Sequence, residues 1–400
     1  AKIVCAKQKT VVSVNCRYWK RAGLNMINQK VAVIGAGIVG ASVAFHLSQH
    51  GVEVSVFDKS MPGSGASDHS FAWLNAFSKQ PRHYYDLNYR SMDRWSRFAQ
   101  QLGDDIGLRW GGNVTYCSDP DEGRRLASES ERLNSWGYSA RLISPEELTT
   151  LEPNLKIGPF HTGIYTPEEG HVVPVKVVKA CMNKIQEAGG KSYLNTFVDS
   201  ITQSGDKAFL HVDDQKIEFD QVVIAAGIDS TKLANSAGIN LPQRRSPGVV
   251  TKTKPLPPFI HNLATLYLPP LSKEEKEIHI RQDVDGVVMI GAGDQESETE
   301  DDSQAHADEL IQRAALYFDQ LSGVEAIRIP IGLRPMPEDD LPVIGFSPEH
   351  NNIYLTLMHS GVTLAPLVGA LAALEIVTGI PNGDLDPYRP DRFATHWLNT

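Results

Sequence analysis

The sequence is poor in cysteine, in positive charge and in long apolar runs. Its four cysteines show no CxxC or metal-ligand spacing, are too few for a disulfide scaffold and fit a reducing compartment. The formal net charge of −10 argues against a nucleic-acid partner, because phosphates bind basic surfaces. No apolar run reaches the roughly 18 residues that a membrane-spanning helix needs, although residues 362–377 come nearest. We therefore expect a soluble, cytoplasmic protein without a membrane span.

Basic residues are concentrated at the start of the chain. Residues 1–30 contain seven Lys or Arg and no Asp or Glu, and Met26 lies just before the first predicted strand. We expect residues 1–29 to be a basic N-terminal extension: either a transit-like or upstream segment, which would address an organelle, or an arm that docks on the acidic body. The acidic run from Asp294 to Asp302 is poorly spaced for calcium, so we expect a solvated loop there and no metal site.

The most informative motif is a glycine-rich turn between a predicted strand and a predicted helix. Apolar residues lead into Gly35, Gly37 and Gly40, residues 41–47 continue at helical spacing, and residues 52–56 alternate as a strand ending at Asp58. This order is typical of a dinucleotide-binding βαβ unit, whose helix N-terminus faces the phosphates. Asp58 can accept hydrogen bonds from both hydroxyls of a ribose, which disfavours NADP. The motif leaves NAD, FAD and a nucleotide-free α/β unit open.

Apolar periodicity elsewhere predicts an α/β protein. With 41% hydrophobic residues, the chain can form two sizeable cores. Helices are predicted at residues 84–102, 119–136, 174–188 and 364–378, and buried strands at 221–226 and 353–357. Residues 241–330 have a different character, with prolines and alternating strands such as 277–281 and 286–291.

Several separated blocks make the chain resemble the D-amino-acid-oxidase-like flavoproteins, which include glycine oxidase, sarcosine oxidase and the amino-acid dehydrogenases. The resemblance spans most of residues 30–380. Its blocks, besides residues 31–58, are Gly63-Ser-Gly-Ala-Ser67, Gly170-His-Val-Val-Pro174, Val223-Ile-Ala-Ala-Gly227, Gly332-Leu-Arg-Pro335, Leu341-Pro-Val-Ile-Gly345 and His359-Ser-Gly-Val-Thr-Leu-Ala-Pro366. Together they imply a discontinuous Rossmann-type FAD-binding domain of residues 30–110, 150–235 and 331–400. A second, mainly antiparallel α+β substrate domain of residues 111–149 and 236–330 would roof the flavin.

The resemblance implies non-covalent FAD as the cofactor. An extended FAD needs protein partners at both ends, and the helix start at residues 360–364 can offer N–H groups to the reduced flavin. The implied cofactor-binding residues are Gly35, Gly37, Ile38, Val39, Gly40, Asp58, Lys59, Gly65, Ala66, Ser67, Val198, Ala226, Gly227, Arg334, Ser360, Gly361, Val362, Thr363 and Leu364. Cys181 is the last cysteine, so a thioether near the last block is not expected, nor is a histidyl link through His69.

The resemblance also implies a site for the substrate carboxylate. Its Gly-Leu-Arg-Pro block assigns this role to Arg334, whose planar guanidinium suits a bidentate carboxylate. A structural salt bridge from Arg334 to Glu338 or Asp339 is the alternative. Arg281 is a second cationic candidate, and His69 completes the expected catalytic set. Tyr267, His279 and His359 are further candidates to border the flavin ring, although single histidines are often structural.

These inferences predict an FAD-dependent oxidoreductase acting on the C–N bond of a small amino acid or secondary amine. Hydride transfer to flavin N5 would give an imine, which hydrolyses to an oxo acid. Oxygen or another acceptor would reoxidise the flavin, and the oligomeric state is open. Two alternatives stay open at this point: an NAD-dependent dehydrogenase, which would not need the block at residues 360–364, and a non-catalytic flavin-binding subunit, which would not need Arg334.

Overall fold

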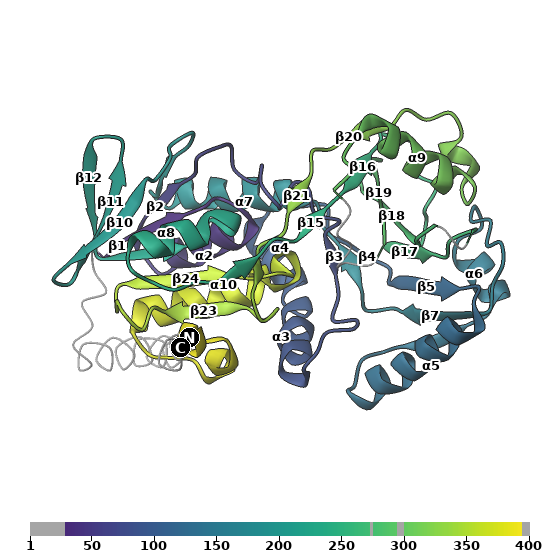
Figure 1. Ribbon diagram of the computed structural model, residues 1–400, viewed down its shortest axis with the longest axis horizontal. Helices are drawn as coiled ribbons and strands as arrows, with labels where there is room; N and C mark the ends of the chain where they lie inside the picture. Colours follow the sequence, from purple (N-terminus) through teal and green to yellow (C-terminus); the bar gives the residue numbers. More distant parts are fainter. Residues whose placement is uncertain (1–28, 273–274, 294–299, 394–400) are drawn as a thin grey trace, which may run out of the picture.

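The computed structural model describes residues 29–272, 275–293 and 300–393, and it is built on two large β-sheets (Figure 1). Residues 1–28 of the predicted extension and residues 294–299 of the predicted acidic loop lie outside the described residues. In Figure 1 the sheet that contains β1 lies at the left, and the sheet that contains β5 and β7 lies at the right.

The first sheet has six strands in the order β23-β24-β13-β1-β2-β9. Their bounds are β1 (Lys30–Ile34), β2 (Glu53–Phe57), β9 (Lys191–Tyr193), β13 (Gln221–Ile224), β23 (Val343–Phe346) and β24 (Ile353–Leu357). All neighbours are parallel except β23 and β24. The middle strands are covered on both faces, which explains their continuous apolar sequences. Val31 and Val33 face one core, whereas Ala32 and Ile34 face the other.

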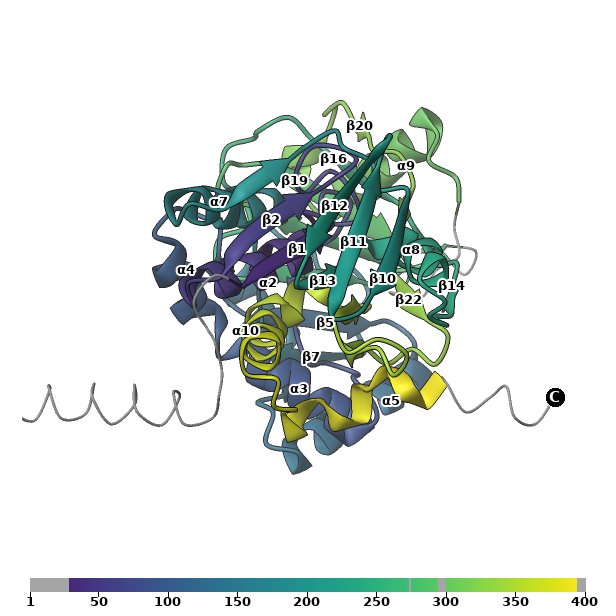
Figure 2. The same ribbon diagram turned by 90° about the vertical axis from the view of Figure 1, so that its left-hand side faces the viewer.

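Helices cover one face of this sheet and a small antiparallel sheet covers the other (Figure 2). The helices are α2 (Ile38–Gln49), α7 (Pro174–Glu187) and α10 (Gly361–Thr378), and the opposite layer is β10 (Ser200–Ser204), β11 (Lys207–Val212), β12 (Gln215–Phe219) and α8 (Ser230–Ser236). Gly369 lets α10 approach α2, because a Cβ there would lie 2.2 Å from Ser42 Oγ. By length and composition α10 could cross a membrane, but 83% of it is buried inside the protein, as in a core helix.

The second sheet has eight strands in the order β20-β16-β19-β18-β17-β5-β7-β6. Their bounds are β5 (Asn113–Cys117), β6 (Arg141–Ile143), β7 (Thr162–Thr166), β16 (Val250–Lys252), β17 (Thr265–Leu268), β18 (Ile278–Gln282), β19 (Val288–Ala292) and β20 (Ile327–Arg328). Only β17 and β5 pair in parallel within it. The sheet is accompanied by α5 (Pro120–Ser135), α6 (Pro145–Leu151) and α9 (Gln304–Ala315). The predicted fold class, a Rossmann-type α/β domain with a mainly antiparallel α+β domain, is therefore confirmed.

Short elements connect the two sheets. They are β3 (Trp73–Leu74), β4 (Arg109–Trp110), β8 (Gly170–His171), β14 (Gln243–Arg244), β15 (Pro247–Gly248), β21 (Gly332–Leu333), β22 (Met336–Pro337), α3 (Arg82–Met92) and α4 (Trp95–Leu102). The single helix predicted at residues 84–102 is thus two helices, interrupted at Asp93 and Arg94. Ser91 Oγ and Trp95 Nε1, on either side of this interruption, both donate to the Thr363 carbonyl, which ties both helices to α10.

The position of β7 differs from the domain boundary expected at residue 150. β7 pairs with β5 and β6 in the second sheet, over the register Asn113 to Thr166, and not beside the parallel sheet. A five-residue strand has a sequence pattern that shows its faces but not its neighbours, so the sequence alone did not reveal this pairing. We propose that the second domain comprises residues 111–166 and 250–328, with the ribbons at residues 241–249 and 331–337 joining it to the first.

Candidate active site

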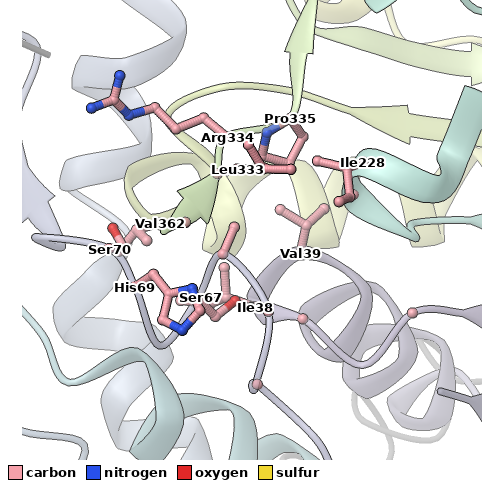
Figure 3. A pocket seen from close by; sticks show the side chains of 18 of the residues that line it. Ile38, Val39, Ser67, His69, Ser70, Ile228, Leu333, Arg334, Pro335 and Val362 are labelled. Carbon is pink, nitrogen blue, oxygen red and sulfur yellow. Dashed lines mark hydrogen bonds between the residues drawn. The ribbon is translucent and has the colours of Figure 1, made fainter. Parts of the chain in front are cut away.

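One elongated cavity of about 500 Å³ runs along the carboxyl ends of the parallel strands. Residues that follow β1, β2, β13 and β24 line it, and so do side chains of β17, β18 and the ribbon at residues 331–335. Open parallel sheets bind ligands at this edge, because the loops and helix N-termini meet there. Figure 3 shows lining side chains from the start of α2, the loop at residues 67–70 and the ribbon at residues 333–335.

The glycine turn has the close packing that its spacing predicts. Gly35 has a φ of +106°, and a Cβ there would lie 2.3 Å from the Ala225 carbonyl oxygen. A Cβ on Gly40 would lie 2.0 Å from the Gly35 carbonyl oxygen, so Gly40 packs the helix and does not itself line the cavity. Gly37 differs, because its nearest neighbour would be Ser67 Oγ at 3.5 Å. The space over Gly37 is therefore open to a ligand.

Asp58 and Lys59 lie at one end of the cavity, where β2 ends. The Asp58 carboxylate accepts hydrogen bonds from the N–H groups of Ala36 (2.7 Å) and Ser60 (2.8 Å), which fixes it beside the glycine turn. A carboxylate has about four acceptor positions, so two stay available to hydroxyls. Lys59 Nζ lies 2.6 Å from an Asp229 carboxylate oxygen across the cavity edge.

The lip of this end is apolar and includes residues that sequence reasoning missed. Val198, Ala226 and Gly227 line it as expected. Phe197 and Ile228 also line it, although 45% and 42% of these side chains are exposed. An exposed apolar residue gives no distinct sequence signal, because single ones are common on protein surfaces.

The small-residue loop at residues 63–67 closes over the N-terminus of α2. Gly63 N–H donates to the Ala36 carbonyl (2.9 Å), and Ile38 N–H donates to Ser67 Oγ (3.0 Å). Gly65, Ala66 and Ser67 all line the cavity, as do Ile38 and Val39 (Figure 3). The loop and the helix N-terminus thus form one continuous wall.

The N-terminus of α10 reaches the same cavity from the far end of the sequence. Ser360 is its N-cap with a φ of +53°, and its side chain makes no capping hydrogen bond. Gly361, Val362 and Thr363 line the cavity, and the N–H groups of a first helical turn have no acceptor within their own helix. Leu364 corrects the prediction: its side chain is fully buried in the core, and its N–H donates to the Ser360 carbonyl (3.0 Å).

Arg334 lines the end of the cavity that is remote from Asp58. Its N–H donates to the Ser246 carbonyl (2.8 Å), and its side chain extends away from Val39 and Ile228 (Figure 3). The guanidinium lies against Gly248, where a Cβ would be 2.8 Å from Nη2. Asp339, one of the two alternative salt-bridge partners, binds Arg392 Nε at 2.7 Å. Among the described lining residues, the acidic ones are Asp58 and Asp229, both at the other end.

Arg281 is not where the sequence predicted. It is 2% exposed and does not line the cavity, because Phe71 lies between Arg281 and the cavity. Its Nε donates to the Phe71 carbonyl (2.6 Å), and Nη1 lies 3.9 Å from Asp283. Burial lowers the pKa of Arg281 to about 10, so it remains charged at neutral pH. Arg281 therefore supports the cavity wall from behind and does not meet a ligand directly.

Aromatic rings form the wall near Arg334. Tyr267 lies 4.9 Å from Trp73 and 5.2 Å from His279 by ring centroids, and Phe71 lies 4.5 Å from His279. All four line the cavity. Burial, and then the charge of Arg334, lower the pKa of His279 to about 4, so its imidazole is neutral. The sequence pointed to Tyr267 and His279, but not to Phe71 and Trp73, whose rings flank Ala72 in a left-handed backbone conformation (φ +59°).

His69 and His359 also border the cavity. His69 packs against Gly332, where a Cβ would lie 2.7 Å from His69 Cβ, and partial burial lowers its pKa. His359 precedes the N-terminus of α10, and burial, aided by the charges of Lys79 and Arg334, holds its pKa well below the usual range. Both are therefore neutral at pH 7, so Arg334 supplies the fixed positive charge at this end.

The cavity fits an extended adenine dinucleotide that carries a flavin. It offers an open glycine at one helix N-terminus, a fixed carboxylate beside it, and the N–H groups of a second helix start at the other end. The two cysteines among the described residues, Cys117 and Cys181, are buried and do not line it. A flavin here would be held without a cysteine thioether.

Known proteins with related sequences and structures agree with this geometry. The family model described as FAD dependent oxidoreductase (DAO) matches residues 30–374. One of the subunits of opine oxidase from Agrobacterium tumefaciens is 28% identical over 92% of this chain and 98% of its own length. Glycine oxidase of Geobacillus kaustophilus is 25% identical over 90% of this chain and 95% of its own length. Its crystal structure covers 92% of this chain and 99% of that chain with a TM-score of 0.80 at 24% identity. The chain therefore belongs to the FAD-dependent oxidoreductase family and is an enzyme that uses FAD, not NAD.

Proposed function

We propose that the protein oxidises the C–N bond of a small amino acid or secondary amine that carries a carboxylate. The observation that carries this proposal is the position of Arg334 in the cavity. It brings a guanidinium to the end opposite Asp58, beside the aromatic wall and the first turn of α10. A guanidinium in a partly desolvated site binds a carboxylate through two parallel hydrogen bonds.

The cofactor-binding roles follow from the same geometry and are part of the proposal. Asp58 would accept hydrogen bonds from the ribose, and the open space over Gly37 would admit the pyrophosphate. Residues 65–67 would cover the pyrophosphate, and the first turn of α10 would offer N–H groups to the flavin. Lys59, Val198, Ala226 and Gly227 would border the adenosine.

The reaction removes two electrons and two hydrogens from the substrate. Bound FAD supplies the hydride acceptor, at flavin N5. Arg334 holds the carboxylate and thereby orients the α C–H bond, while the neighbouring neutral histidines add no charge that would repel an amine. The substrate carbon loses a hydride and the nitrogen a proton, which gives an imine. Water then hydrolyses the imine to an oxo acid and ammonia or an amine.

The test is anaerobic mixing of the FAD-loaded protein with a panel of glycine, sarcosine, proline and D-amino acids. Loss of the flavin absorbance band identifies a substrate, and admission of oxygen then separates an oxidase from an enzyme that needs another acceptor. We expect at least one compound to bleach the flavin. If none of them does, the proposal loses its chemical basis.

The matched variants are Arg334→Ala and Arg245→Ala. Arg334→Ala is expected to raise KM for carboxylated substrates roughly 30- to 100-fold while FAD stays bound, because a desolvated charge pair is lost. Arg245 is exposed, pairs with Glu300 and does not line the cavity, so its removal controls for the loss of one surface charge. An unchanged KM in Arg334→Ala would show that the carboxylate binds elsewhere.

A further inference from the structure

Glu169 is a buried carboxyl group that the proposed reaction does not use. It is 0% exposed and does not line the cavity. Its Oε1 accepts a hydrogen bond from Tyr138 OH (2.5 Å), and its Oε2 accepts one from Trp73 Nε1 (2.6 Å). Burial of a carboxyl group costs free energy unless hydrogen bonds replace those to water. The two donors therefore stabilise Glu169 in its buried position.

The Trp73 indole connects this buried network to the cavity. Trp73 lines the cavity, and its ring lies 4.9 Å from the Tyr267 ring. Its carbonyl oxygen accepts a hydrogen bond from Thr363 Oγ1 (3.1 Å), in the first turn of α10. The backbone of Trp73 is therefore fixed to the helix start, whereas the angle of its indole is fixed by Glu169.

The wall beside Arg334 has one fixed cation and a row of rings. Trp73, Tyr267 and His279 follow one another in contact, and His279 lies close enough to Arg334 for the arginine charge to lower its pKa. A carboxylate held by Arg334 therefore has its remaining atoms next to aromatic faces. Such faces favour an apolar, planar group over a second charge.

We propose that Trp73 selects the apolar group that the substrate carries beside its carboxylate, and that Glu169 is the positioning residue that fixes the Trp73 indole. The substrate class is then a monocarboxylic amino acid or amine with an apolar substituent. This inference rests on the proposed function, because it assumes that the carboxylate binds Arg334. Glu169 acts only through the indole N–H, and it touches neither substrate nor cofactor.

The chain offers variants that separate these roles. Trp73→Phe keeps a ring and removes the N–H donor. Glu169→Leu keeps a similar volume and removes the acceptor, whereas Glu169→Gln keeps an acceptor for the indole. Glu168→Leu is the matched control. The neighbouring Glu168 carboxylate is exposed, accepts hydrogen bonds from Tyr89 OH and Ser139 Oγ, and does not line the cavity.

The probes are benzoate and acetate, two unreactive carboxylates that differ in their apolar body. Their Kd values are measured on the FAD-loaded protein from the perturbation of the flavin absorbance spectrum. Trp73→Phe and Glu169→Leu are each expected to raise the benzoate Kd roughly five- to tenfold and the acetate Kd less than about twofold. Glu169→Gln is expected to raise the benzoate Kd less than Glu169→Leu does. Glu168→Leu is expected to bind both carboxylates as the unmodified protein does.

The decisive measurement is the double variant Trp73→Phe with Glu169→Leu. If Glu169 acts through the indole N–H, the double variant binds benzoate no more weakly than Trp73→Phe alone. Additive losses, an equal loss for acetate, or an unchanged benzoate Kd in Trp73→Phe would overturn the inference. If Glu169→Leu does not fold, Trp73→Phe and Glu169→Gln still decide it. Failure of both carboxylates to bind, together with no bleaching by any amine, would overturn the proposed function as well.

Discussion

The missing side chain at Gly248 makes room for the Arg334 guanidinium. An alanine Cβ at this position would lie 2.8 Å from Nη2 and 2.9 Å from Nε of Arg334, closer than such atoms approach in proteins. Gly248 lies in β15, which pairs with β21 just before Arg334, so the glycine and the arginine are held on neighbouring strands of one ribbon. The position of the proposed carboxylate anchor therefore depends on a residue that offers no chemistry itself.

Gly248→Ala is expected to displace the arginine without removing it. The guanidinium can shift, because it is the end of the flexible Arg334 side chain. We therefore expect KM for the carboxylated substrate to rise about tenfold while kcat changes less. Steady-state kinetics measure this, with Gly383→Ala as a control at an exposed site where the nearest atom would be 3.7 Å away. Equal kinetics in Gly248→Ala and the control would contradict the prediction.

Gly37 caps the start of α2 and Gly40 lies in its first turn, and we expect substitutions at these two glycines to have different effects. A Cβ on Gly37 meets no atom closer than 3.5 Å, so Gly37→Ala should fold normally and lose FAD affinity, at least about tenfold, because the methyl group occupies the space over the helix N-terminus. Gly40→Ala forces a Cβ against the Gly35 carbonyl, so its free energy of unfolding should fall by about 3 kcal/mol or more. Urea unfolding of the FAD-free proteins and FAD titration measure the two effects. A destabilised Gly37→Ala with unchanged FAD affinity would reverse the assignment.

Stability should fall in weak acid because of His46. Burial, and then the charges of His50 and Arg94, lower the pKa of His46 from 6.5 to about 4. The unfolded chain therefore binds the proton more tightly than the folded one, so the contribution is complete above pH 6.5 and is lost as the pH falls towards 4. The expected loss between pH 7.5 and pH 5 is about 2 kcal/mol for this group.

The comparison that isolates His46 is urea unfolding of His46→Phe at the same two pH values. Its loss of stability should be smaller than that of the unmodified protein by about the same 2 kcal/mol. The phenyl ring keeps the packing that the imidazole makes with Phe98, at 5.6 Å between ring centroids. Because the charge of His50 contributes to the low pKa of His46, replacement of His50 should reduce the acid-induced loss of stability only in part, and less than His46→Phe does. An unaltered slope in His46→Phe would assign the acid sensitivity to other groups.

Local patterns predicted the strands and helices that surround the proposed nucleotide-binding half of the site. Each of three elements can be predicted from a pattern within some 20 neighbouring residues: the glycine turn, the strand ending at Asp58 and the start of α10. The structure has these elements in those places. The same kind of pattern failed for Arg281. A strand's alternation shows that a side chain faces one side of a sheet, but not that Phe71, some 200 residues earlier, covers it there.

The network under the aromatic wall could not be read from the sequence either. Trp73, Tyr138 and Glu169 lie in three separate segments, and a glutamate in a loop is usually exposed. Only the three-dimensional pairing of β3 with β8 places Glu169 next to the indole. For the same reason the sequence did not predict that β7 pairs with β5.

The strand order of the first sheet has a consequence for how the protein is made. β1 is the first strand of the described residues, yet it pairs with β13 some 190 residues later, and β13 in turn pairs with β24 near residue 355. The growing chain therefore cannot complete this sheet until β24 has left the ribosome, or add the α10 end of the cavity until residues 361–378 have followed. Such a high contact order predicts slow folding and a long period in which apolar strand edges need protection by chaperones.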